Sequence, residues 1–483
     1  MKNKIALLPL DNRPVSCLLP KQIAEFSGID LVLPERQYLG NLKQGANLDY
    51  IDDWIKALNK DNLLILALDT FMYGGLVQSR KHSIDSDKLK ERANKLSKIS
   101  SSPKYGFSTI LRIADSNINE EEHEYWDKHG KDLFKWSELM HKVGRGVRSR
   151  ETSHSELIEN WYQATQKIPP SILAHYKNHR DKNFAVNSYW LDSLHSHLFQ
   201  YLIFACDDSS RYGMNVVEAE YLKKLIQNHR FSYLTKVITG TDEVSLILLA
   251  KAFIAAMNIA PSVSLFFTDE KGKEIIGKYE TNSICSVVQD QLNILNIVVK
   301  DIQSSDLIIC VHVPTLHQND HIFDVNTGGT KESVNKLLEF LNKNQKPFVV
   351  ADVAYANGSD PVLIKTLAHS NINWDLCYGY AGWNTTSNTS GTALAMGICR
   401  WVAEKNRTFK MELFKEALMT RILDDYAYQA VVRKTQSNNI ADEMKKVAQN
   451  LPKLYDIESR EINYSYPWNR TFEIEISFKK AVK

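Results

Sequence analysis

Two adjacent aspartates follow an apolar segment, YLIFAC, in the stretch FACDDSSRYG (204–213). Neighbouring residues of a strand point to opposite faces, but both can lean into one cleft where the chain turns. Two carboxylates held together resist double ionisation, so one keeps its proton and can act as a general acid. We therefore predict Asp207 and Asp208 as catalytic residues. A helix N-cap is the simpler alternative, but it explains one acid rather than the pair.

Polar side chains follow several other apolar segments, and parallel strands would gather their carboxyl ends at one edge of a sheet. The residues that we predict to bind substrate there are Asp11, Arg13, Asp69, Tyr73, Arg80, Arg112, Arg211, Asp242, Glu243, Asp352, Trp383, Asn384 and Asn388. Structural alternatives stay open: an Asp11–Arg13 ion pair, a buried ion pair of Arg112, helix capping by Thr241 or Asp242, and acids at Asp242-Glu243 that complement a helix dipole. We expect Asp11, Arg13, Asp69, Asp207, Asp208, Asp242 and the 383–390 segment to converge on one site.

The segment GYAGWNTTSNTSGTALAMG (379–397) combines Trp383 with a run of short hydrogen-bonding side chains. We expect a loop here, with a helix that opens at Gly391. Such a loop at a helix N-terminus can bind an anion or a polyol through side chains and free backbone N–H groups. A solvated loop without a ligand is the alternative.

Other chemistries find little support in the motifs. The sequence has no GxGxxG, GxxxxGK[ST], HExxH or GxSxG, and Gly74-Gly75 is too short for a phosphate loop. His317 and His321 have helical spacing, but Pro314 and polar neighbours indicate a loop. We therefore expect neither a cofactor nor a bound metal.

Composition narrows the class of protein. The 483 residues carry a net charge of +2, so no strong field favours nucleic acid or an anionic membrane. No segment approaches the length of a membrane span, and no signal peptide is visible. The six cysteines form no CxxC, which is typical of thiols in a reducing compartment, so we expect a cytoplasmic protein. Aromatic residues, at 10%, favour a small carbohydrate as partner, and a homo-oligomer is left open.

Apolar runs alternate with amphipathic segments, which predicts an α/β fold. Candidate strands lie at 4–10, 30–34, 62–68, 106–113, 201–206, 234–239, 263–268, 306–313, 347–353 and 375–380. Most are apolar throughout, as in a parallel sheet covered on both faces. We expect a barrel-like or doubly wound catalytic domain at 1–270, with a helical insert at 117–198 that is either a lid or a packing layer. A smaller Rossmann-like domain at 283–405 and a helical tail with a terminal strand at 406–483 follow.

Several motifs together resemble a bacterial family carried as domain of unknown function four-one-two-seven. They are LPLDNRPVS, LDTFMYGGLVQSR, ILRIAD, DDSSRYG with Glu218, GTDEVSLILLAK and AGWNTTSNTSGTALA. They extend from the N-terminus to about Ala395. The family name implies no activity.

The aspartate pair also resembles, more loosely, that of β-N-acetylglucosaminidases that use substrate-assisted catalysis. This resemblance implies that Asp207 polarises a 2-acetamido group and that Asp208 is the acid and base. The first strand ends in LDNRP rather than in that family's Gly-rich sequence.

The function that we expect is hydrolysis of a small sugar or amino-sugar glycoside by paired carboxylates. Two alternatives stay open. One is a metal-assisted hydrolase, lyase or isomerase, and the other is a protein that binds a sugar or an anion without catalysis.

Overall fold

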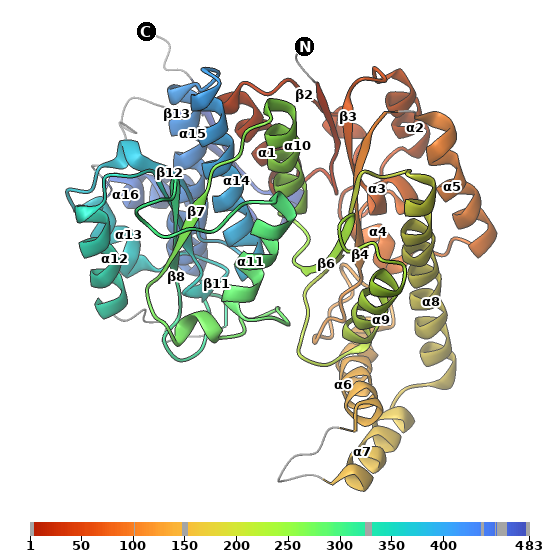
Figure 1. Ribbon diagram of the computed structural model, residues 1–483. Helices are drawn as coiled ribbons and strands as arrows, with labels where there is room; N and C mark the ends of the chain where they lie inside the picture. The colour runs from red at the N-terminus through yellow and green to blue at the C-terminus, as the bar shows by residue number, and fades with distance from the viewer. Residues whose placement is uncertain are drawn as a thin grey trace. The chain divides into compact units, whose positions relative to one another are not determined.

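The chain is described by a computed structural model, shown in Figure 1. The structure describes residues 4–100, 102–146, 153–323, 331–435, 439–449, 451 and 461–479. Two compact units make up the chain. The six-stranded unit comprises Asn3–Asn12 and Val32–Thr241. The four-stranded unit comprises Met1–Lys2, Arg13–Leu31 and Asp242–Lys483.

The six-stranded unit is built on one sheet with the order β2-β1-β3-β4-β5-β6. Its strands are β1 (Ile5–Leu8), β2 (Leu31–Val32), β3 (Leu63–Ala67), β4 (Lys104–Ile110), β5 (Tyr201–Cys206) and β6 (Thr235–Thr239). The pairs from β1 to β6 are parallel, with Ile5 opposite Leu63 and Tyr105 opposite Tyr201. Every residue of β1, β4 and β5 is buried, as the apolar runs predicted.

This sheet is open, because β2 and β6 stand at its two edges in the described part of the chain. Of the two expected forms, the structure therefore has the doubly wound one rather than the barrel. Its order begins 2-1-3-4-5, which is common in doubly wound sheets and places ligand sites at the carboxyl ends of the strands.

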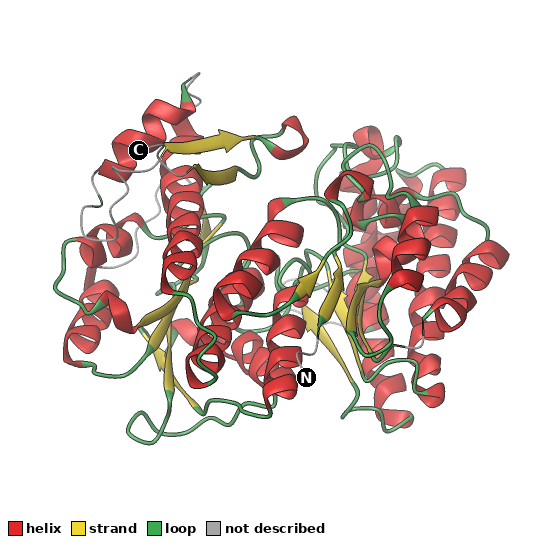
Figure 2. Ribbon diagram, turned by 90° about the horizontal axis from the view of Figure 1, so that it is seen from above, coloured by secondary structure: helices red, strands yellow, loops and turns green. Residues whose placement is uncertain are grey.

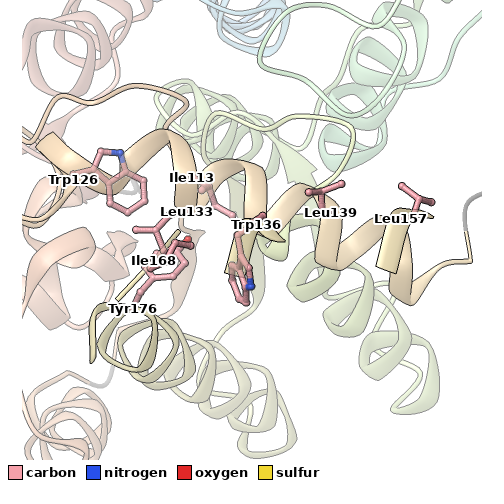
Figure 3. Close-up of a cluster of buried hydrophobic side chains, with 9 residues drawn as sticks. Ile113, Trp126, Leu133, Trp136, Leu139, Leu157, Ile168 and Tyr176 are labelled. Atoms are coloured by element: carbon pink, nitrogen blue, oxygen red, sulfur yellow. The ribbon is translucent and has the colours of Figure 1, made fainter. Parts of the chain in front are cut away.

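The helices of this unit include the expected insert. They are α2 (Leu48–Ala57), α3 (Leu68–Tyr73), α4 (Leu76–Lys81), α5 (Ser86–Ile99), α6 (Trp126–Gly144), α7 (His154–Gln166), α8 (Pro170–Asp192) and α9 (Met214–Asn228). Short 3₁₀ turns lie at Arg36–Tyr38 and Ser193–Ser196. Helices α6 to α8 form the insert between β4 and β5, and their hydrophobic cluster includes Trp126, Leu133, Trp136 and Tyr176 (Figure 3). Residues 147–152 of the expected insert lie outside the described residues.

The four-stranded unit has a second parallel sheet, in the order β12-β10-β8-β7. Its strands are β7 (Val263–Phe267), β8 (Leu307–His312), β10 (Phe348–Asp352) and β12 (Cys377–Ala381), with the small pairs β9 (Asn319–Asp320) and β11 (Tyr355–Ala356), and β13 (Glu461–Ser465) and β14 (Glu475–Lys479). Helices lie on either side of the larger sheet (Figure 2).

The helices of this unit are α1 (Pro14–Ser27), α10 (Val244–Met257), α11 (Ile284–Leu295), α12 (Lys331–Lys343), α13 (Pro361–Ala368), α14 (Thr386–Lys405), α15 (Met411–Arg421) and α16 (Ile440–Gln449). Short 3₁₀ turns lie at Gly272–Glu274, Trp374–Leu376, Val432–Thr435 and Pro467–Asn469. Helix α14 packs closely on β10, since a Cβ at Gly397 would lie 2.1 Å from Cγ1 of Val349. A ten-residue π-helix, Ile422–Val431, follows α15. Such helices are rare and occur often at functional sites.

The unit boundary lies at Thr241–Asp242, earlier than the expected domain boundary near residue 270. The reason is β7, which pairs with β8 and so belongs to the second sheet. Helix α1 also joins the four-stranded unit. The expected tail is part of this unit as well, because the Lys410 N–H donates to the Phe26 carbonyl at 2.8 Å and joins the start of α15 to α1.

Candidate functional site

Asp207 and Asp208 lie where β5 ends, as the sequence predicted. The Asp207 N–H donates to the Ile110 carbonyl at 3.1 Å, which continues the pairing of β5 with β4 past Cys206. The two side chains then differ in exposure: 7% for Asp207 and 39% for Asp208. The chain therefore buries one carboxylate of the pair and leaves its neighbour open to solvent.

Arg80 holds the buried carboxylate. Its Nε and Nη2 donate to Oδ2 of Asp207 at 3.0 and 2.5 Å, and its Nη1 pairs with Glu121. Arg80 lies on α4, which begins directly after Gly74-Gly75. Gly74 has φ of +92° and a Cβ there would lie 2.8 Å from the Ala46 backbone nitrogen, so this turn requires glycine. The turn at Gly74-Gly75 therefore sets the starting position of α4, the helix that carries Arg80.

Arg112 links the exposed aspartate to two glutamates. It follows β4, and its guanidinium donates to Glu122 at 3.0 Å, to Glu121 at 3.0 Å and to Asp208 Oδ2 at 3.1 Å. Together with Asp207 and Arg80, these residues form a network of two arginines and four carboxylates. We call these six residues the carboxylate–arginine network. Its charge is net negative, so it suits a neutral or cationic ligand better than an anion.

The pKa of Asp208 is raised to about 6, first by the protein atoms packed around it and then by the Asp207 carboxylate. Arg112 opposes this shift. Solvent reaches 39% of the side chain and screens part of both effects, so the upward direction is the result that matters. A carboxylic acid that keeps its proton to higher pH beside an ion-paired carboxylate is the arrangement that general acid catalysis needs.

Asp69 lies on α3 and is hydrogen-bonded to β4. Its Oδ2 accepts hydrogen bonds from the Thr109 N–H and hydroxyl at 2.9 and 2.7 Å. Burial raises the pKa of Asp69 to about 6, the Thr109 bonds oppose the shift, and the charge of Asp207 adds to it. Asp69 is 2% exposed, so its position is that of a support rather than of a substrate contact.

Tyr73 and Arg211 lie apart from these contacts in the same unit. The ring of Tyr73 stacks on His82, with centroids 4.6 Å apart. Arg211 is exposed, and its guanidinium lies 5.6 Å from the centre of the Tyr212 ring. Asp11, also in this unit, is buried.

Glu121 and Glu122 of the network, and the adjacent Arg180, were not among the predicted site residues. Arg180 on α8 donates to both oxygens of Glu218 at 2.8 and 2.7 Å, and to the Leu111 and Arg112 carbonyls at 2.9 and 3.2 Å. It therefore fixes the segment that carries Arg112. The acidic run EEEH (120–123) was a visible signal for the glutamates, whereas nothing in the sequence placed Arg180 there.

A cavity of about 690 Å³ adjoins the network. Its lining residues are Lys81, Asn119, Glu120, Glu122, His123, Glu124, Tyr125, Ser171, Ile172 and His175. Glu122 belongs to both the cavity wall and the network, whereas Asp207 and Asp208 are not among the lining residues.

The remaining predicted residues belong to the four-stranded unit. The guanidinium of Arg13 forms an ion pair with the Asp242 carboxylate, with N–O distances of 2.7 and 3.3 Å. The same guanidinium also lies 5.4 Å from the centre of the Trp468 ring. This ion pair joins the residue that precedes α1 to the segment that precedes α10.

The expected loop at 383–390 is largely helix. Helix α14 begins at Thr386, five residues before the expected Gly391, because the Thr385 hydroxyl caps the Asn388 N–H. Trp383 and Asn388 are buried, and Asn384 occupies the turn before the helix with φ of +69°. The prediction of a long open loop was therefore wrong.

The carboxylate of Glu280 lies at the N-terminus of α14. Oε1 of Glu280 accepts the Ser387 N–H and hydroxyl at 2.8 and 2.7 Å. Glu243 lies close to it: burial raises the pKa of Glu243 well above its usual range, and the Glu280 charge adds to the shift. Both carboxylate oxygens of Glu243 are buried and have no hydrogen-bond partner among the described residues.

Asp352 ends β10 and is fully buried. Its Oδ2 accepts from the Asp360 N–H at 2.7 Å and from the Tyr380 hydroxyl at 3.2 Å, and burial raises its pKa to about 7. His312, at the end of β8, bonds to Asp360 at 2.9 Å. These contacts form a buried polar network rather than an open site.

A second adjacent pair, Asp424-Asp425, lies in the π-helix and was visible in the sequence but not predicted. Arg421 pairs with Asp424 at 2.8 Å and with Asp425 at 3.0 Å, and Asp425 also accepts the Gly382 N–H at 2.7 Å. Unlike Asp208, both aspartates are buried.

In the described part of the chain, no three His, Cys, Asp or Glu side chains come together as metal ligands. Nor does any described helix combine the length and the apolar run that crossing a membrane needs.

Comparison with known proteins identifies the family and nothing more specific. No curated protein and no solved structure matches the chain. The family model described as "Protein of unknown function (DUF4127)" matches residues 5–477. The match includes the sheets of both units except the last residues of β14, and it includes every motif that suggested the resemblance. The chain therefore belongs to the family Protein of unknown function (DUF4127).

Proposed function

We propose that the protein hydrolyses a glycosidic bond in a small sugar or amino-sugar glycoside, with Asp208 as the general acid. The observation that supports the proposal is the different environment of the two adjacent aspartates. Arg80 holds Asp207 through two N–H groups in a buried position, while the adjacent Asp208 is 39% exposed. Burial and the Asp207 charge both raise the pKa of Asp208, which favours its protonated form to higher pH than for a free carboxyl group.

In this reaction Asp208 donates its proton to the glycosidic oxygen as the bond to the leaving group breaks. Asp207 is ion-paired and only 7% exposed, so its role is to orient and polarise rather than to attack. The 2-acetamido group of an amino sugar would then supply the nucleophile, and Asp208, now ionised, would activate the water that completes hydrolysis. Asp69, on α3, and Arg112, which follows β4, support this pair.

Replacing Asp208 tests the proposal. We expect Asp208→Asn to lower kcat by a factor of about 10² to 10⁴, because the amide cannot donate the proton. Turnover of a panel of nitrophenyl glycosides and N-acetylglycosaminides measures the loss, and circular dichroism checks the fold. Asp115→Asn is the matched control, since Asp115 is an exposed acid that follows β4 as Asp208 follows β5. An Asp208→Asn enzyme with full activity would contradict the role of Asp208.

Ligand binding without catalysis is the second candidate, and the cavity beside the network favours it. It is distinguished by saccharide binding with no turnover across the same panel. The metal-assisted alternative has no ligand set among the described residues.

A further inference from the structure

The cavity beside the carboxylate–arginine network has the dimensions of a ligand site. Its volume of about 690 Å³ falls within the range of small-molecule pockets. Its walls come from the segment between β4 and α6, the first turns of α8 and the end of α4. Trp126 and Tyr176, which follow the lining residues Tyr125 and His175, are buried together with ring centroids 5.7 Å apart (Figure 3). One hydrophobic cluster therefore anchors two walls of the cavity.

The lining excludes two common classes of ligand. Pockets for cofactors and lipids are mostly apolar, whereas Ile172 is the only aliphatic residue in this lining. A phosphate would require net positive charge, but Lys81 is the only lysine or arginine in the lining, which also contains three glutamates. What remains is a ligand that is rich in hydroxyl groups and either neutral or cationic.

The cavity offers hydrogen-bonding groups that suit such a ligand. The Tyr125 hydroxyl lies 3.2 Å from Nδ1 of His175. Nε2 of His123 is buried and has no hydrogen-bond partner among the described residues. Burial and then the neighbouring His175 lower the pKa of His123 to about 4, so its ring is neutral at pH 7 and can both donate and accept.

One side chain connects the cavity to the acid. Arg112 donates to Glu122 in the cavity wall at 3.0 Å and to Asp208 at 3.1 Å. A ligand that contacts Glu122 would therefore be separated from Asp208 by a single guanidinium group.

We propose that this cavity is a sugar-binding subsite, which holds a neutral or amino-bearing saccharide ring next to the bond that Asp208 protonates. The inference rests on the proposed glycosidase function and names the part of the substrate that the insert recognises. Tyr125, His123 and His175 are its binding residues, and Arg112 is a positioning residue.

A large side chain introduced into the cavity lining tests whether a saccharide binds there. The probes are N,N′-diacetylchitobiose, cellobiose and glucosamine, with inorganic phosphate as counter-probe, and binding to the full chain is measured by calorimetry and saturation-transfer NMR. Ser171→Trp adds an indole to the lining, and Ala174→Trp adds the same group to an exposed, non-lining position of α8. We expect Ser171→Trp to weaken binding of at least one saccharide tenfold or more and Ala174→Trp to change it less than twofold. His175→Ala, which removes one hydrogen-bonding ring, replaces Ser171→Trp if the latter unfolds.

The outcomes separate this inference from the proposed function. Equal binding by the two tryptophan variants, tighter binding of phosphate than of any saccharide, or no saccharide binding by the wild type would each overturn the subsite. The proposed function fails separately, when Asp208→Asn retains turnover. Saccharide binding that Ser171→Trp abolishes, in a protein that turns over no glycoside, would leave a sugar site and remove the glycosidase.

Discussion

Asp207 and Asp208 are neighbours in the chain but occupy different electrostatic environments. Both follow β5, yet Arg80 gives two N–H groups to Asp207 and none to Asp208. Arg112 gives one N–H group each to Asp208, Glu121 and Glu122. Asp208, the more exposed aspartate, therefore has fewer hydrogen bonds from arginine to its carboxylate than Asp207 has. This is the physical basis for assigning different roles to two identical side chains.

The pH dependence of activity should report on Asp208. A general acid must be protonated, so kcat/KM falls as pH rises through its pKa of about 6. Asp207→Asn removes the neighbouring negative charge, which lowers this pKa and moves the alkaline limb to lower pH. Arg112→Gln removes a positive charge beside Asp208 and moves the limb to higher pH. The measurement is the pH profile of kcat/KM on one glycoside.

Shifts in opposite directions are specific to a titrating Asp208. Loss of stability alone would lower activity in both variants without moving the limb. A limb that stays in place in both variants would contradict the assignment of Asp208 as the acid.

At the scale of elements, the helical insert supports the site rather than only covering the sheet. Helix α8 carries Arg180, which bonds the carbonyls of Leu111 and Arg112 where β4 has ended. It also carries His179, whose ring lies 4.6 Å from that of His82 and 4.8 Å from that of His123. The insert is thus joined to α4 and to the segment before α6 by side-chain contacts.

The histidine cluster makes stability depend on pH in a defined direction. Burial lowers the pKa of His82 and His123 to about 4 and that of His179 to about 3. Between pH 6.5 and pH 4 the unfolded chain binds protons that the folded chain excludes, so stability is complete above pH 6.5 and is lost as pH falls. The charges of Lys81, Lys182 and Arg180 reinforce this direction, while a hydrogen bond between His82 and Asn183 and one between His179 and the Ser79 carbonyl oppose it.

We expect the melting temperature to fall from pH 7 to pH 5, and to fall less in His123→Gln. His369→Gln is the control, because His369 is exposed on a helix end of the four-stranded unit. Melting followed by circular dichroism at the two pH values provides the comparison. An identical pH effect in wild type and His123→Gln would contradict a contribution from this cluster.

At the scale of the whole molecule, each unit has its own sheet and its own buried polar network. In the four-stranded unit the network centres on Asp352, Asp360, Arg421 and Asp425, at the carboxyl ends of β8, β10 and β12. Its side chains are buried and make their hydrogen bonds and ion pairs within the unit, so we interpret it as a structural centre.

Substitutions in this centre should destabilise one unit selectively. Asp425→Asn breaks a buried pair with Arg421 and should cost about 3 kcal/mol. Asp352→Asn keeps an oxygen for the Asp360 N–H and should cost less than about 1 kcal/mol. Hydrogen exchange should rise in β8, β10 and β12 for Asp425→Asn, with β4 and β5 unchanged. Equal acceleration in both sheets would show that the units do not unfold separately.

Much of the fold could be predicted from the sequence, because the positions of strands and helices depend on local residue patterns. Apolar runs predicted all ten strands of the two large sheets to within a few residues, since burial on both faces requires such runs. The insert and the break at Pro169-Pro170 were also predicted, because helical periodicity and proline act locally. The start of α14 was misplaced, because a run of Thr, Ser and Asn reads as a loop until tertiary packing buries it.

The sequence by itself determined the α/β class, the family and the aspartate pair at the end of β5, because these depend on residue type and short spacing. Only the tertiary structure decided which carboxylates are paired. Arg80 is 127 residues from Asp207, and Arg13 is 229 residues from Asp242. Charge partners so distant along the chain leave no periodic signal. Their positions follow from the strand order, which separates the motifs into two units and leaves Asp208 exposed beside its ion-paired neighbour.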